Sequence, residues 1–142
     1  MEGNLILKRI TILLLCLCIF FLSSCSYVGD VSNVEIITVE SKYFTQDEIL
    51  DAIEIVKTEF VDFDGCTLVK IGYVGDEKLV ENIVGNKPEN PQFIVLDCEF
   101  KTSITSASEG FNAYETYEYC WWKWYLEKDA FGNWKIEHYG VA

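Results

Sequence analysis

Basic residues are scarce in this chain of 142 residues. Lysine and arginine together number 11, against 23 aspartate and glutamate residues, and the formal net charge is −12 at pH 7. Proteins that bind nucleic acid or anionic lipid headgroups use clusters of positive charge to attract phosphate groups. The deficit predicts no nucleic-acid partner, and it predicts that anionic headgroups repel the folded body.

Histidine and catalytic motifs are also nearly absent. His138 is the single histidine, and although a lone histidine is a natural acid–base group, we expect it to be structural or partly solvated. No serine or cysteine stands in a recognisable nucleophile motif, and the sequence has no glycine-rich phosphate loop. The sequence therefore predicts no catalytic residue and no cofactor. A cell-envelope enzyme that uses His138 or an aspartate as its base is the alternative.

The cysteines lack the spacing of a metal site. The chain has six of them, but no Cys-x-x-Cys pair and no His–Cys cluster, so we expect no metal site. Three of the six, Cys66, Cys98 and Cys120, lie beyond the N-terminal segment, and three thiols cannot all pair.

The N-terminal segment holds an apolar run at residues 10–22. The run is shorter than the about 20 residues that a helix needs to cross a bilayer. Lys8 and Arg9 precede it and small residues follow it, which is the order of pieces in a secretory signal peptide. Its end, LSSC at residues 22–25, resembles the lipobox of bacterial lipoproteins.

The lipobox resemblance implies diacylglycerol on the sulfur of Cys25 and cleavage before that residue. An ordinary signal peptide with a chance cysteine, or an uncleaved anchor, is the alternative. Because one acyl chain binds membranes only marginally, the two chains of a diacylated cysteine suit stable anchoring. We therefore expect export and a lipid anchor at the outer face of the cell membrane. The expected organisation is a signal peptide at residues 1–24, a lipidated tether with an edge strand at 25–43, and one α+β domain at 44–142.

The clearest local pattern in the chain begins at Thr45. The sequence from Thr45 to Glu48 matches a capping box. Apolar residues then recur at the three-and-four spacing of one helix face, and Gly65 is expected to end the helix in the left-handed conformation. The apolar stripe consists of Ile49, Ile53, Val56, Phe60 and Phe63.

Four strands are expected to follow this helix, at residues 66–74, 92–102, 114–128 and 134–141. Period-two alternation divides the rings of the third of these strands between two faces. One set of rings is expected to face the helix, and the other set forms a candidate ligand or partner surface. The alternative is that a short helix around Leu79, or a neighbouring strand, covers this second set. The candidate surface consists of Tyr117, Tyr119, Trp121 and Tyr125.

The same alternation predicts how the strands pair. Matching the apolar faces sets Leu126 against Trp134 in the last hairpin and Cys98 against Cys120 in the hairpin before it. This register makes Cys98 and Cys120 a candidate disulfide in an exported protein. Two buried free thiols are the favoured alternative, because buried cysteines commonly act as small hydrophobic side chains.

Several short motifs occur in order along residues 43–140: FTQDEILDAIEIVKTEF, then GCTL at 65–68, WKW at 122–124 and W-K-x-x-x-x-G at 134–140. Their order resembles small lipoproteins of clostridia and related Firmicutes that carry a domain of unknown function. That family offers no known catalytic residues. The resemblance implies a fold similar to the nuclear-transport-factor-2-like and cystatin-like group. We therefore expect an α+β fold with one long amphipathic N-terminal helix packed on a curved antiparallel sheet of about four strands.

In folds of that group, the sheet curls around an open end of the helix, and the helix-facing rings would then line a cleft of the kind that small ligands use. The candidate pocket consists of Trp122, Trp124, Trp134 and His138. The sequence as a whole predicts a membrane-anchored binding or interaction domain without catalysis. Its partners are the membrane, through the lipid at Cys25, and an unknown protein or small molecule.

Overall fold

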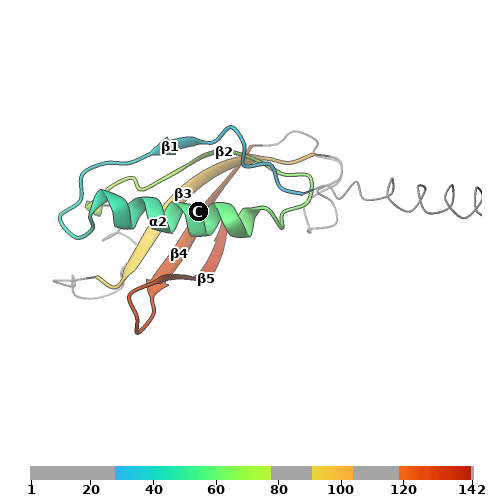
Figure 1. Ribbon diagram of the computed structural model, residues 1–142. Coiled ribbons are helices and arrows are strands. Elements are labelled where there is room, and N and C mark those ends of the chain that lie inside the picture. Colours follow the sequence, from blue (N-terminus) through green and yellow to red (C-terminus); the bar gives the residue numbers. More distant parts are fainter. Residues whose placement is uncertain (1–27, 78–90, 104–118, 142) are drawn as a thin grey trace, which may run out of the picture.

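The computed structural model describes residues 28–77, 91–103 and 119–141. The elements in these residues are β1 (Glu35–Ile37), α2 (Gln46–Phe60), β2 (Thr67–Gly72), β3 (Phe93–Lys101), β4 (Tyr119–Lys128) and β5 (Trp134–Val141). The strands form one five-stranded sheet in the order β1-β2-β3-β4-β5. Helix α2 lies across one face of this sheet (Figure 1).

The sheet is mixed, because β1 runs parallel to β2 whereas the other neighbours are antiparallel. A parallel pair needs a long crossover connection, and α2 supplies it because it lies between β1 and β2 in the sequence. The expected fold, one long N-terminal helix on an antiparallel sheet of about four strands, is therefore wrong. The helix has only 15 residues, and β1 precedes it and adds a parallel fifth strand.

The chain joins the folded body well before β1. The Gly29 N–H donates to the Val61 carbonyl at 2.8 Å, and the Asp30 N–H donates to the Cys66 carbonyl at 2.8 Å. A Cβ at Gly29 would lie 2.1 Å from the Phe60 carbonyl oxygen, so only glycine allows this close approach. Part of the segment expected to be a tether is thus fixed to the end of α2, and its expected edge strand is β1.

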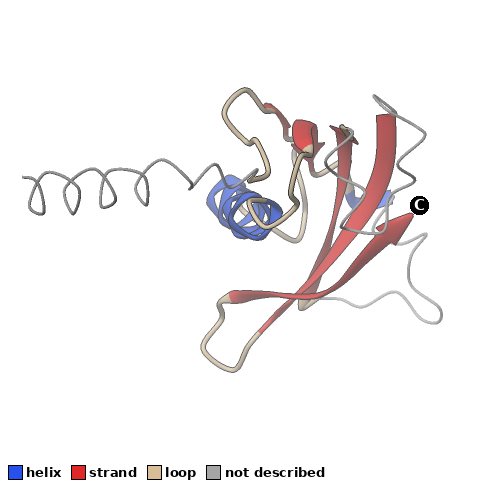
Figure 2. Cartoon of the chain, turned by 90° about the vertical axis from the view of Figure 1, so that its right-hand side faces the viewer, coloured by secondary structure: helices blue, strands red, loops and turns tan. Residues whose placement is uncertain are grey.

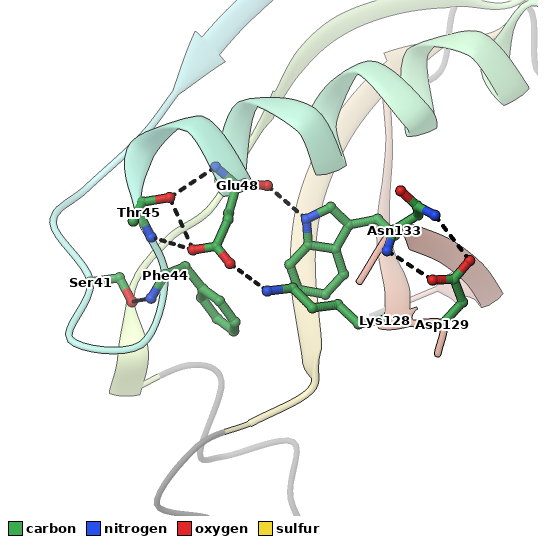
Figure 3. A network of polar contacts seen from close by, with 8 residues as sticks. Ser41, Phe44, Thr45, Glu48, Lys128, Asp129 and Asn133 are labelled. Atoms are coloured by element: carbon green, nitrogen blue, oxygen red, sulfur yellow. Dashed lines mark hydrogen bonds and ion pairs between the residues drawn. The ribbon is translucent and has the colours of Figure 1, made fainter. Parts of the chain in front are cut away.

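Helix α2 begins as its sequence predicts. Thr45 is the N-cap: its side chain accepts from the Glu48 N–H at 3.2 Å, and the Glu48 carboxylate accepts from the Thr45 N–H at 2.8 Å. These reciprocal bonds form the predicted capping box (Figure 3) and satisfy donors that the first helical turn leaves unpaired.

The predicted end of α2 is wrong. The helix stops at Phe60, because the Asp62 and Phe63 N–H groups bond to carbonyls three residues back and tighten the chain into a turn. Phe63 then folds back, and its ring stacks on that of Phe60 at 5.0 Å. Gly65 does adopt a left-handed φ of 72°, but it does so in the loop beyond the helix.

The hydrophobic core lies between α2 and the sheet face that we call the inner face; the opposite face is the outer face. Figure 2 shows α2 end-on at one side of the sheet. Burial of apolar area is the main favourable term in folding, at about 25 cal/mol per Å². The largest fully buried side chains are Trp124, Tyr73, Phe60, Phe100, Ile49, Ile53, Leu68, Ile71, Ile94, Leu96 and Leu126.

The strand register differs from the expected one in two ways. Strands β3 and β5 are each shifted by two residues against β4, so that Cys98 opposes Trp122, and Leu126 opposes Ile136 instead of Trp134. Because side chains alternate with period two, these shifts by themselves leave every residue on its predicted face. Strand β5 contains a β-bulge. Leu126 opposes Ile136, but Tyr125 opposes His138, so Glu137 is an extra residue that reverses the faces of the residues after it.

Candidate functional site

The candidate pocket of four residues does not exist as a unit. Trp124 is fully buried, and its Nε1 donates to the Cys98 Sγ at 3.1 Å. Trp122 is half-buried and stacks on Tyr139 with ring centroids 5.6 Å apart. His138, which alternation places on the inner face, is instead exposed on the outer face. The bulge at Glu137 causes this reversal, and it brings Tyr139 to the inner face opposite Trp124.

Trp134 joins the β4–β5 hairpin to the start of α2. Its Nε1 donates to the Glu48 carbonyl at 2.8 Å, and the Lys128 ammonium lies 4.9 Å from the centroid of its ring. Lys128 also donates to the Glu48 carboxylate (Figure 3). This hydrogen bond, with that from the Thr45 N–H, lowers the pKa of Glu48 from its ordinary value of 4.5 to about 2. Every group in this network has a partner, so we assign it a structural role.

The outer face is organised in rows of cross-strand neighbours. The first row consists of Glu35, Lys70, Glu99 and Trp121; the second of Ile37, Gly72, Asp97, Lys123 and Gly140; the third of Val95, Tyr125 and His138. Helix α2 lies on the opposite side of the sheet from this face (Figure 2).

Trp121 is the most conspicuous side chain of the outer face, since 61% of its surface is exposed. It stands at a shallow hollow of about 270 Å³, whose lining includes Lys70 and Glu99 of the first row and Gly72 and Asp97 of the second. The hollow therefore combines one large open ring with charges of both signs.

A second hollow, of about 420 Å³, lies further along β4 on the outer face. The rings of Tyr125 and His138 stack there, nearly parallel, with centroids 4.2 Å apart. Phe93, Glu127 and Glu137 also line this hollow. Two aromatic platforms, each beside carboxylates, thus share one face of the sheet.

The charges around Trp121 differ in how they are satisfied. Lys70 Nζ lies 3.4 Å from Glu35 Oε2, an ion pair across β1 and β2. The carboxylates of Asp97 and Glu99 have no hydrogen-bond or ion-pair partner within the part of the chain that the structure describes. Their position beside Trp121 depends on how the strands pair, so the sequence alone does not predict it.

The other predicted site residues are placed as follows. Strand β4 includes Tyr119, which opposes Lys101. Cys25 and Tyr117 lie outside the described residues. Cys98 opposes Trp122 and not Cys120. Cys66, Cys98 and Cys120 are all free thiols. Burial raises the pKa of the Cys98 thiol to about 11, so this thiol is protonated and unreactive at pH 7.

Two glycines in the second row shape the outer face. The sequence analysis did not identify them. A Cβ at Gly72 would lie 2.0 Å from the Ile37 carbonyl oxygen, whereas a Cβ at Gly140 would meet no atom within 4 Å. Gly72 therefore permits β1 to approach, and Gly140 leaves open space beside Lys123. Glycine within a strand often marks close approach of a backbone or a ligand, and that signal was present in the sequence.

A third hollow, of about 330 Å³, lies between α2 and the β4–β5 turn, beside Asp51, Glu54 and Asn133. It has carboxylates but no open ring, since Trp134 is buried there. Among the described residues, no three His, Cys, Asp or Glu side chains converge as metal ligands.

Comparisons of the chain with protein-family models, with curated proteins and with solved structures give no match. The described helix is too short and too polar to span a bilayer.

Proposed function

We propose that this chain is an exported lipoprotein whose domain binds a ligand through the outer face of its sheet. The observation that carries the binding proposal is Trp121, an indole that is 61% exposed among charged side chains. Single exposed apolar residues are common, but here a second hollow with stacked rings lies on the same face. Aromatic rings that gather on an open face favour a binding surface.

The anchoring part of the proposal is supported by the N-terminal sequence. Lys8 and Arg9, the apolar run at residues 10–22, and the lipobox ending in Cys25 occur in the order that a lipoprotein signal requires. The motif order that resembles small clostridial lipoproteins agrees with this assignment. The net charge of −12 favours lipid, and not charge, as the attachment to an anionic bilayer.

Metabolic labelling with a fatty acid, followed by membrane fractionation, tests the anchor. Cys25→Ala is expected to abolish the label and to move the protein out of the membrane fraction, because two acyl chains supply the attachment. Cys18→Ala, within the apolar run, is the matched control and is expected to retain both. Equal labelling of the Cys25→Ala variant and the wild type would contradict the anchor.

A further inference from the structure

We infer that the outer face binds a linear glycan, with Trp121 as the stacking platform for one sugar ring. The inference rests on the proposed function, because it names the ligand class of the same face. A sugar ring has an apolar face of C–H bonds and a rim of hydroxyl groups that donate and accept hydrogen bonds. It therefore needs an open aromatic ring, surrounded by both donors and acceptors.

The first hollow supplies this combination. Trp121 provides the open ring, and an indole presents a large apolar face of negative potential to C–H groups. Lys70 lines the same hollow and donates, while the carboxylates of Asp97 and Glu99 accept. Because neither carboxylate has a partner in the described chain, hydroxyl groups of a ligand can replace water there without breaking hydrogen bonds within the protein.

The charge pattern disfavours other classes of ligand. An anionic polymer or headgroup is repelled by Asp97 and Glu99 and by the net charge of the chain. A strongly cationic ligand meets Lys70 in the same hollow, so a neutral ligand that both donates and accepts hydrogen bonds fits this lining better. A peptide that binds by strand addition pairs with the edge of a sheet and not with its face. A small apolar ligand needs a more enclosed cavity than this shallow hollow.

The second hollow sets the length of the ligand. Trp121 and Tyr125 point to the same face and lie four residues apart, which corresponds to about 13 Å along a strand. That distance is longer than one sugar ring, so a single chain has to pass over the second row to reach both platforms. Gly140 leaves the necessary space, since its missing side chain would meet no atom within 4 Å.

Isothermal titration of the purified full-length lipoprotein in detergent tests this inference. The probes are β-1,4-linked disaccharides and hexasaccharides of glucose and of N-acetylglucosamine. We expect the hexasaccharide to bind more tightly than the disaccharide. Trp121→Ala is expected to weaken binding of both by about tenfold or more, as loss of a central aromatic anchor does. Phe131→Ala, which removes a ring that is 90% exposed in the β4–β5 turn, is the matched control and is expected to change neither affinity.

A second variant tests the path between the platforms. Gly140→Leu adds bulk to the outer face where space is open, so the fold tolerates it. It is expected to weaken binding of the hexasaccharide and to leave the affinity for the disaccharide unchanged. Equal affinities of wild type and Trp121→Ala, or the absence of binding to any of the four probes, would overturn the glycan inference.

Hydroxyl-radical footprinting distinguishes failure of the glycan inference from failure of the proposed binding function of the outer face. In the purified protein both Trp121 and Phe131 are expected to be oxidised. In intact cells, protection of Trp121 but not of Phe131 would support a ligand on the outer face. If that protection occurs without glycan binding, the ligand belongs to another class, and only the glycan inference is lost. If Trp121 is oxidised equally in cells and in the purified protein, both are contradicted.

Discussion

Trp124, on the inner face of β4, is fully buried, whereas Trp121, on the outer face of the same strand, is 61% exposed. The indole N–H of Trp124 has a partner in Cys98, and its ring contacts Phe63 and Tyr139. Around Trp121 lie charged side chains, two of which have no partner in the described chain. The comparison teaches that the abundance of rings in β4 has two separate causes. The inner rings stabilise the fold, whereas the ring of Trp121 on the outer face is left exposed.

The comparison between the two faces is tested most strongly by Trp124→Ala, which is expected to cause the largest loss of stability. Removal of a fully buried tryptophan leaves a cavity, and substitutions of this kind cost about 3–5 kcal/mol of stability. Trp121→Ala is the matched variant and is expected to change stability by no more than about 0.5 kcal/mol. Chemical denaturation followed by circular dichroism measures both. Similar losses for the two variants would show that the outer ring also belongs to the core.

A smaller effect is expected at the two glycines of the second row. Gly72→Ala places a methyl group against the backbone of Ile37, and overpacking of this kind costs about 1–3 kcal/mol. Hydrogen exchange is expected to become faster at the Tyr73 amide, which donates to the Ile37 carbonyl at 3.0 Å. Gly140→Ala meets no atom and is expected to be neutral or slightly stabilising, because alanine restricts the unfolded chain. Unchanged protection in Gly72→Ala would contradict the close approach of β1.

The smallest effect concerns two ion pairs. The pKa of Glu48 is lowered to about 2 in the folded protein, so its contribution to stability is present above its unfolded value of about 4.5. That contribution is lost as the pH falls from about 4.5 toward 2. Glu48→Gln keeps an acceptor for the capping box but loses the charge beside Lys128. We expect a loss of about 1 kcal/mol at pH 7 and a flatter dependence on pH in this range.

Glu137→Gln is the matched control for that measurement. It removes the ion pair between Lys135 and Glu137, which is exposed in the turn-proximal part of β5. Exposed pairs contribute little, so we expect no measurable change in stability. A pH dependence in Glu48→Gln equal to that of the wild type would show that the carboxylate of Glu48 does not titrate with a lowered pKa.

The sequence predicts some of these features well, because they depend on neighbours along the chain. The capping box at Thr45 and the opposite faces of Trp121 and Trp124 follow from local spacing. The position of His138 does not, because the bulge at Glu137 depends on how two strands and their turn fit together. The parallel pairing of β1 is also a long-range property, since it requires α2 as a crossover.

The outer-face site was only partly predictable for the same reason. Alternation identified Trp121 and Tyr125 as rings on one face. The neighbourhood of Trp121 depends on the register of β2, β3 and β4, which brings Lys70, Asp97 and Glu99 to one hollow. A shift of two residues between strands leaves the faces unchanged but exchanges the neighbours in every row.

The fixed position of Gly29 would limit how far the domain could move away from the membrane surface. With a lipid on Cys25, three residues would lie between the anchor and Gly29, and the four Cα–Cα steps would span at most about 14 Å when extended. The end of α2, which is hydrogen-bonded to Gly29, would therefore lie close to the bilayer, and the domain would move only within a thin layer above it. A polymer strand would have to enter that layer to be captured. Once one sugar ring was held at Trp121, the second platform on the same strand would be at a high local concentration for the rest of the polymer.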